Sequence, residues 1–406
     1  MKSFYRRCLS VLLVSVMMVL LLGCEMAEDE NKVTDIKAPT GEAATDLDHD
    51  AVTMKIEKIK GVLEKYYMGD IDYEKATDGI YAGLIDSLGD PYTVYFSPSE
   101  YKEFALTTNG NYAGVGSTVT TNADGNVEFV KPFKNGPAYN AGVLPGDILC
   151  EVDGEDVLGM DIDAVVQKMR GEPGTQVSFK IYRPKDSEYI DLTVVRDNVE
   201  EPTIEYEMLE DDIGYIICTA FDKVTEKQYL DAVDDLTVKG MKALVIDLRN
   251  NPGGMLTTVT SMLDRILPKN KLLIYMEDKN GNREEYFSKS SKTVDVPIAV
   301  LINGNSASAS EVFAGCLQDY GVATLVGTKS FGKGIVQSLI PLGDGSAVKV
   351  TTSKYFSPLG RNIHGVGFEP DIKVELDKEL KTLVEIPKEK DNQLQAAIQC
   401  VKEKLK

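Results

Sequence analysis

Two stretches near the start of the chain repeat apolar residues at helical spacing. The first is VTMKIEKIKGVLEKYY, residues 52–67, and the second is YEKATDGIYAGLIDSL, residues 73–88, which stops at a Gly-Asp-Pro turn. Apolar positions three or four residues apart predict amphipathic helices. Since neither stretch carries a polar cluster suited to chemistry, the pattern predicts an N-terminal helical region, residues 51–103, that serves packing or dimerisation.

Between residues 104 and 198 the pattern changes to short β-type runs separated by glycine. These runs are GVGSTVT, NVEFVKPF, ILCEVDG, QVSFKIYR and YIDLTVVR, and DIDAVVQKMR is the single good helix among them. Short strands with turn residues between them predict a small β-rich module.

A third pattern covers residues 199–385, where apolar strands alternate with helices. This alternation predicts an α/β layered core, in which ligands usually bind at the strand ends. Two stretches directly follow predicted strands, DLRNNPGG at 247–254 and INGNSASASEVFAGCLQDYG at 302–321. The fold class is therefore a mixed α/β and β protein of several domains.

The final segment, residues 386–406, is predicted to form a C-terminal helix. Its apolar stripe consists of Leu394, Ala397, Ile398, Val401 and Leu405. A stripe of this kind needs a surface to cover it. We therefore predict a homodimer built from this helix and the N-terminal helices.

The N-terminus carries the features of a targeting signal. A basic start precedes a mainly apolar run from Leu9 to Leu22, which is too short to span a bilayer comfortably. Leu-Leu-Gly-Cys at 21–24 resembles the bacterial lipobox, so we expect a lipoprotein signal peptide over 1–23 and lipidation of Cys24. The acidic stretch 24–50, which lacks aromatic residues, predicts a flexible tether. A membrane-anchored location outside the bacterial cytoplasm follows, and a plain secretory signal that yields a secreted protein is the alternative.

The composition excludes several classes of function. The 406 residues carry a formal charge of −20, and no basic cluster follows the first few residues, so nucleic acid would be repelled. No P-loop is present, so no nucleotide-driven step and no cofactor are expected. Cys150, Cys218 and Cys316 lie in apolar surroundings and predict buried small hydrophobes rather than a metal site or a disulfide framework. A bridge between distant cysteines stays open.

The stretch NGNSASASEVFAGC, residues 303–316, sets three serines on alternate positions. A serine nucleophile needs a base, and the chain has only two histidines, His49 in the tether and His364 in GRNIHGVG. Lys333 in SFGKGIVQS is the other candidate, because its flanking glycines permit close backbone packing. To act near neutrality its pKa must fall by about 2–3 units from about 10.4, which burial would have to supply.

Part of the β-rich module resembles a known family of domains. GPAYNAGVLPGDILCEVDGEDV at 136–157 resembles the signature of PDZ domains, which capture a chain end as an added strand. The resemblance implies a carboxylate-binding loop formed by Tyr112, Ala113, Gly114, Val115 and Gly116; a purely structural β-barrel is the alternative.

NSASASEVFAGCLQDYG, FGKGIVQ, DLRNNPGG and GRNIHGVGFEPDI, together with the PDZ-like module, resemble the carboxyl-terminal processing proteases over about residues 51–375. The resemblance implies an ATP-independent serine endopeptidase that engages substrate C-termini. It makes Ser308 the nucleophile, Lys333 the base and Gln337 the support of the lysine. Ser306 or Ser310 then has a sufficient structural role as a helix N-cap.

The tetrahedral oxyanion of such a reaction needs two donors. The backbone N–H of Ala309 and that of Gly253 or Gly254 are the candidates, although DLRNNPGG could also be a plain turn. Arg170 matches an arginine common in the family and could relay peptide occupancy to the protease core, or be an ordinary cation at a helix C-terminus. The alternatives to the dyad enzyme are a non-catalytic PDZ adaptor with a protease-like fold and a hydrolase that depends on His364.

Overall fold

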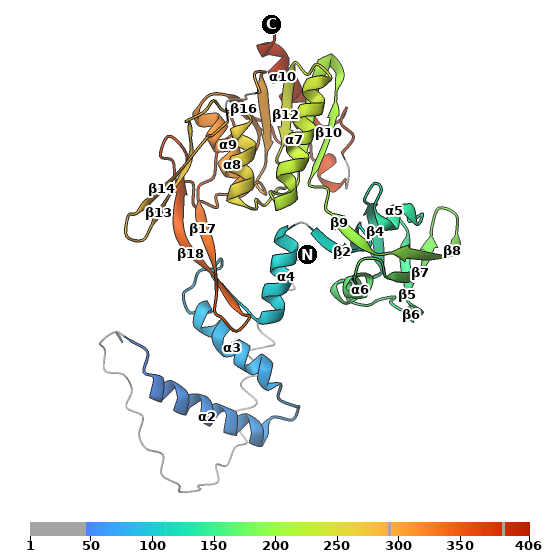
Figure 1. Cartoon of the computed structure of the whole chain (residues 1–406), viewed down its shortest axis with the longest axis vertical. Helices are drawn as coiled ribbons and strands as arrows, with labels where there is room; N and C mark the ends of the chain where they lie inside the picture. Colours follow the sequence, from blue (N-terminus) through green and yellow to red (C-terminus); the bar gives the residue numbers. More distant parts are fainter. Residues whose placement is uncertain (1–45, 110, 291–293, 384–385) are drawn as a thin grey trace, which may run out of the picture. The chain divides into compact units, whose positions relative to one another are not determined.

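Figure 1 shows the computed structural model, which describes residues 46–109, 111–290, 294–383 and 386–406. The predicted signal, Cys24 and nearly all of the predicted tether lie outside these residues. No helix within them is long and apolar enough to cross a membrane. The chain divides into two units after Asp72.

The two predicted N-terminal helices are present. Helix α2 spans His49–Tyr66 in the first unit, where the Asp48 carboxylate caps it by accepting from Ala51 N at 3.0 Å. Its apolar stripe is exposed and includes Met54, Ile59, Val62, Leu63 and Tyr66. Helix α3, Tyr73–Asp86, opens the second unit.

The sequence pattern did not predict the two elements that follow α3. Strand β1, Val94–Phe96, contacts α3 through a 3.0 Å hydrogen bond from Tyr95 Oη to Asp78. Helix α4, Pro98–Asn109, starts where Glu100 accepts from the Ser97 backbone N–H at 2.9 Å.

The β-rich module is built on a six-stranded sheet, in which five strands follow one another and a short sixth strand pairs at the side. Its strands run in the order β3-β4-β5-β7-β8, with β6 beside β5, while β2 and β9 form a separate pair. Its elements are β2 Asn111–Gly114, β3 Ser117–Thr121, β4 Val127–Pro132, α5 Pro137–Asn140, β5 Ile148–Val152, β6 Glu155–Asp156, α6 Ile162–Met169, β7 Gln176–Arg183, β8 Glu188–Val195 and β9 Asp197–Glu200. The core of this module is Phe129, Leu149, Val165, Phe179 and Ile181, each almost fully buried.

The α/β core is built on a six-stranded sheet in the order β10-β11-β12-β15-β16-β19. Only β10 is antiparallel to its neighbour. Its strands are β10 Ile204–Met208, β11 Ile213–Cys218, β12 Ala243–Asp247, β15 Ile298–Ile302, β16 Ala323–Gly327 and β19 Ile372–Lys373. Every residue of β12 and β15 is buried, as expected for parallel strands covered on both faces.

Helices cover both faces of this sheet (Figure 1). Helices α7 Lys223–Val238, α8 Leu256–Asp264 and α9 Ala309–Asp319 pack on one face, and α10 Asn392–Lys404 packs on the other. Short helical turns lie at Glu210–Asp212 and Leu380–Thr382.

A second sheet completes the core. It is antiparallel, in the order β1-β18-β13-β14 with β17 beside β18. The new members are β13 Leu272–Asp278, β14 Arg283–Phe287, β17 Ile335–Pro341 and β18 Ala347–Phe356.

Most of the stripe on the C-terminal helix is covered within the chain. Leu394, Ala397 and Val401 are buried against the chain's own sheet, beside residues such as Val245 and Leu301. The sheet has an apolar second face that must be covered, and α10 covers it. These three residues are therefore covered within the chain, whereas Leu405 at the end of the stripe is exposed. The stripe does not depend on a second copy for its cover, and a dimer built from this helix stays a prediction.

The prediction that the cysteines are buried is confirmed for the described ones. Cys150, Cys218, Cys316 and Cys400 are all free and buried.

Candidate active site

Two loops that are distant in sequence meet at the carboxyl ends of two central strands of the six-stranded sheet. Strands β12 and β15 are parallel neighbours, so their carboxyl ends lie side by side. Residues 248–254 follow β12, and residues 303–308 follow β15. The backbone joins the loops directly, since Ala307 N donates to Asn251 O at 3.0 Å.

The outer two of the three serines hold these loops together. Ser306 Oγ donates to Leu248 O at 2.7 Å, and Ser310 Oγ donates to Asn251 O at 2.9 Å. Both serines are fully buried. Neither is the helix N-cap, so the predicted capping role was wrong: Ser308 occupies the N-cap position, and its neighbours join the two loops instead.

Ser308 is the half-buried serine of the three and has an unusual backbone. Its φ of 55° and ψ of −114° lie in a region that residues with a Cβ rarely occupy. Neighbouring groups fix this conformation: its N–H donates to Glu311 at 2.9 Å, and its carbonyl accepts from Tyr355 Oη at 3.2 Å. The hydroxyl is thereby presented at the turn into α9.

Glu311 joins the serine loop to the lysine loop, a role that was not predicted from the sequence. This buried carboxylate accepts from Ser308 N at 2.9 Å and from three groups of the other loop: Ser330 Oγ at 2.6 Å, Gly332 N at 2.7 Å and Lys333 N at 2.8 Å. The signal was present as a capping-box spacing, because a Glu three residues after a Ser cap can accept from the cap N–H.

The glycines beside Lys333 permit close packing, as expected, but their neighbour is the segment 362–367. A Cβ at Gly334 would lie 2.6 Å from His364 N, and one at Gly332 would lie 2.9 Å from Gly367 N. The lysine backbone is thus fixed by GRNIHGVG on one side and by Glu311 on the other.

The side chain of Lys333 is half-buried and lies over an aromatic ring. Its Nζ is 4.7 Å from the ring centroid of Tyr92, and among the described residues no hydrogen bond joins it to Ser308. Desolvation lowers the pKa of Lys333, the positive charge of Lys349 lowers it further, and Asp90 opposes both effects. The shift has the direction that a lysine base requires.

Gln337 lies on β17, four residues after the lysine, and is paired with Thr351 of β18. Its side-chain Nε2 is buried and has no hydrogen-bond partner in the described part of the chain. A buried amide that lacks a partner usually needs an explanation. It is available to a group that moves or binds beside it.

The Gly-Gly turn after β12 lies against the serine. A Cβ on Gly253, whose φ is 109°, would be 2.8 Å from Ser308 Cβ and 2.9 Å from Ala309 N. The N–H of Gly253 already donates to Asn251 Oδ1 at 2.8 Å, whereas those of Gly254 and Ala309 donate to no described acceptor. A Cβ on Gly254 would instead meet Phe221 O at 2.5 Å.

We expect Gly253→Ala to lower kcat by about 10²-fold or more, because the new methyl would displace Ser308 and the donor beside it. Gly304→Ala is the matched control in the serine loop, since its Cβ would lie 3.9 Å from Lys329 O, an ordinary contact distance, and its φ is not positive. Peptide cleavage assays on both variants measure the effect. Equal activity of the two would contradict this close approach.

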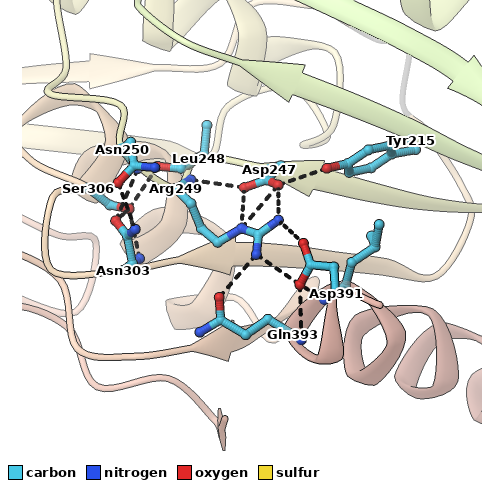
Figure 2. Close-up of polar contacts among 10 residues, drawn as sticks. Tyr215, Asp247, Leu248, Arg249, Asn250, Asn303, Ser306, Asp391 and Gln393 are labelled. Atoms are coloured by element: carbon cyan, nitrogen blue, oxygen red, sulfur yellow. Dashed lines mark hydrogen bonds and ion pairs between the residues drawn. The ribbon is translucent and has the colours of Figure 1, made fainter. Parts of the chain in front are cut away.

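An ion-pair network centred on Arg249 lies at the start of the same loop (Figure 2). Arg249 donates to Asp247 at the end of β12, to the α10 N-cap Asp391 at 2.7 Å, and to Gln393 at 3.0 Å. Tyr215 Oη also donates to Asp247, at 2.8 Å. The C-terminal helix is thereby fastened to the segment that carries Gly253 and Gly254.

Among the described residues, no hydrogen bond joins His364 to Ser308. His364 is exposed, and its ring centroid is 6.4 Å from that of Tyr92 in an edge contact. Within the described residues, no His, Cys, Asp or Glu side chains gather as a group of three able to hold a metal ion.

The predicted carboxylate loop lies at the end of β2. The carbonyls of Val115 and Gly116 accept from Ala138 N at 2.7 Å and Phe133 N at 2.9 Å, while their own N–H groups donate to no described acceptor. Arg170, at the end of α6, forms an ion pair with Glu103 of α4.

Known proteins are similar to this chain along most of its length. Family models match as Peptidase family S41 over residues 212–374, PDZ domain over 132–183, and activating protease CtpB N-terminal domain over 13–99. Carboxy-terminal processing protease CtpB of Bacillus subtilis is 34% identical over 355 residues, covering 87% of this chain and 73% of that protein. Carboxy-terminal processing protease CtpA of the same organism is 36% identical, covering 79% and 69%.

A solved structure of a protein assigned to the S41 proteases, from Bacteroides fragilis, covers 83% of this chain and 93% of its own, with a TM-score of 0.54 and 17% identity. It supports the fold alone. Together with the relatives, the folded modules define the class as a serine-type peptidase with a PDZ domain. More particularly, the chain belongs to the carboxy-terminal processing proteases of peptidase family S41. The predicted family and fold class are confirmed.

Proposed function

We propose that the protein is an ATP-independent endopeptidase in which Ser308 and Lys333 form the catalytic dyad. The neutral Lys333 amine takes the proton of Ser308 Oγ as this oxygen attacks the substrate carbonyl. The resulting ammonium returns the proton to the leaving amine, and an acyl-serine remains. Water, deprotonated by the same lysine, then releases the second product.

The observation that carries the proposal is the shared support of the two residues. Glu311 accepts from the backbone N–H groups of both Ser308 and Lys333, at 2.9 and 2.8 Å, so one buried carboxylate sets the spacing of nucleophile and base. The strained φ of Ser308 and the lowered pKa of Lys333 are features typical of a functional site.

For the oxyanion we propose the N–H groups of Ala309 and Gly254. Both lack a described acceptor, whereas the N–H of Gly253 is already bound by Asn251. Gly253 then serves to let the turn approach Ser308. The buried and unpartnered amide of Gln337 supports a role in orienting the lysine amine once that amine leaves Tyr92.

Covalent labelling with an active-site serine reagent tests this function. We expect one adduct per chain, at Ser308, and none in Lys333→Ala at pH 7, because the hydroxyl then lacks its base. A non-catalytic PDZ adaptor would not be labelled in either protein. A His364-dependent hydrolase would lose labelling in His364→Ala and keep it in Lys333→Ala.

We further propose that the PDZ domain binds the C-terminus of the substrate at Tyr112–Gly116. The N–H groups of Val115 and Gly116, which donate to no acceptor in the described part of the chain, can donate to a terminal carboxylate. The ion pair between Arg170 and Glu103 links this domain to α4, which supports a relay of peptide occupancy.

Amidating the C-terminus of a peptide substrate is expected to slow cleavage roughly ten- to a hundredfold at low substrate concentration, because a charge-assisted hydrogen bond is lost. Arg170→Ala is expected to lower the maximal rate while peptide affinity is preserved. Lys168→Ala is the matched control, since Lys168 lies on the same helix and pairs with Glu155 inside the PDZ domain. Equal cleavage of acid and amide substrates would show that the domain does not read chain ends.

Two proposals concern assembly and location. The exposed stripe on α2 supports a homodimer formed through the N-terminal helices, and a monomer by light scattering at micromolar concentration would argue against it. Lipidation at Cys24 would anchor the protein outside the cytoplasm. Release of Cys24→Ser from the membrane fraction tests the anchor against plain secretion.

A further inference from the structure

A turn from the N-terminal region reaches the proposed catalytic lysine. Residues 90–93, Asp-Pro-Tyr-Thr, lie between α3 and β1, before the PDZ domain in the sequence. They place Tyr92 against Lys333, whose Nζ is 4.7 Å from the ring centroid. From the sequence, this stretch was predicted only to end the helix before it.

The turn is fixed to the strands that carry Gln337. Asp90 accepts from Tyr92 N at 3.0 Å and from Thr93 Oγ1 at 2.7 Å. Thr93 Oγ1 in turn accepts from Thr351 N at 3.1 Å, and Thr351 is the strand partner of Gln337. Thr93 is buried, and β1 continues from it along β18. The backbone of Tyr92 is therefore fixed to the same sheet that carries Gln337, and β17 of this sheet begins two residues after Lys333.

The charges around this ring act on the lysine from several elements. Asp90 belongs to the same turn, and Lys349 lies on β18; both act on the charge of the lysine. The ring of His364 makes an edge contact with the Tyr92 ring, with 6.4 Å between the two centroids. The face of an aromatic ring attracts an ammonium ion, and this attraction is lost when the amine becomes neutral.

We propose that Tyr92 is a positioning residue whose ring face holds the ammonium form of Lys333. Lys333 becomes the base when it gives its proton to solvent and the neutral amine leaves the ring for Ser308. The inference rests on Lys333 being the base of the proposed reaction. It adds a residue from outside the PDZ domain and the S41 match to the active site.

Comparing Tyr92→Leu with Tyr92→Phe isolates the ring face, since both variants lack the hydroxyl and both keep an apolar side chain over the amine. Competitive acylation with trace acetic anhydride across pH 6–11, read by mass spectrometry of the Lys333 peptide, measures the pKa of this amine in the full chain. The midpoint is expected to be about 0.4–1 pH unit lower in Tyr92→Leu. Lys329, exposed in the same loop, is the internal control and should not shift.

Peptide cleavage gives the second measurement. Because the neutral amine is the active form, the ratio of kcat/KM at pH 6.5 to its alkaline plateau should be about 2- to 10-fold higher in Tyr92→Leu than in Tyr92→Phe. A purely structural role would lower both values alike and leave the ratio unchanged. The same comparison in a His364→Gln background should give the same shift.

An equal or higher Lys333 midpoint in Tyr92→Leu would overturn the proposal, as would a shift that disappears in the His364→Gln background. These outcomes are distinct from failure of the dyad. If Lys333→Ala kept its activity, the cleavage profile would no longer report on the lysine, but acylation would still measure whether Tyr92 holds the ammonium.

Discussion

Ser308→Ala and Lys333→Ala are each expected to lower kcat by about 10⁴-fold or more while leaving the thermal unfolding transition in place. Nucleophile and base act as one unit, so removing either should cost nearly as much as removing both. Stopped assays with a peptide that ends in a free carboxylate, at enzyme concentrations high enough to detect residual turnover, measure the loss.

Lys329→Ala is the matched control for the lysine, because Lys329 lies four residues before it and forms an exposed ion pair with Glu369 at 3.0 Å. In the wild type the rate should rise with pH as Lys333 loses its proton. Since burial lowers the pKa of Lys333 from 10.5, the midpoint should lie below that value. Turnover by Lys333→Ala within tenfold of wild type at pH 7 would rule out the dyad.

Glu311→Ala is expected to lower both the stability and the activity of the enzyme. Its carboxylate accepts from Ser308 N, Ser330 Oγ, Gly332 N and Lys333 N. Removing it leaves buried donors without partners, so we expect the free energy of unfolding to fall by about 3–5 kcal/mol. The rate should fall by about 10²-fold or more, because the spacing of the two loops is no longer fixed.

Glu311→Gln tests whether the negative charge of this side chain matters in addition to its shape, because Gln has nearly the same shape and no charge. The amide keeps one acceptor oxygen but directs an NH₂ group at donors, so we expect a smaller loss of stability and a rate still well below wild type. Glu369→Gln, an exposed carboxylate paired with Lys329, serves as the control. Urea unfolding and kcat/KM of the three variants provide the measurements. A Glu311→Ala variant with wild-type stability and rate would contradict the bridging role.

Much of the fold could be predicted from hydrophobic spacing. The helices at 49–66 and 73–86, the β-rich module with its longer helix α6 and the alternating core all follow from patterns of period 3.6 or 2. Strand β1 and helix α4 were missed because three strand residues and a short polar helix carry too little periodic signal.

Some residues of the candidate site were predicted from the sequence, and others were found only in the structure. Ser308, Lys333, Gln337 and the Gly-Gly turn were proposed from their motifs, and the structure places the serine, the turn and the lysine loop around Glu311. Glu311 itself offered a capping-box spacing that was not used. The long-range contacts of Arg249 and Tyr92 gave no local signal, since Asp391 and Lys333 are 142 and 241 positions further along the chain.

By itself the sequence determined the order of modules, the residue types able to do chemistry and the family, because these depend on spacing and identity within short segments. The tertiary structure decided which faces are covered and which groups meet. The stripe on α10 packs on the chain's own sheet because that sheet has an apolar second face. The sequence of the helix alone does not show which surface will cover its stripe. Likewise, Lys333 lies over Tyr92 because β1 pairs with β18, and the energy of such long-range pairing depends on partners that the local sequence cannot specify.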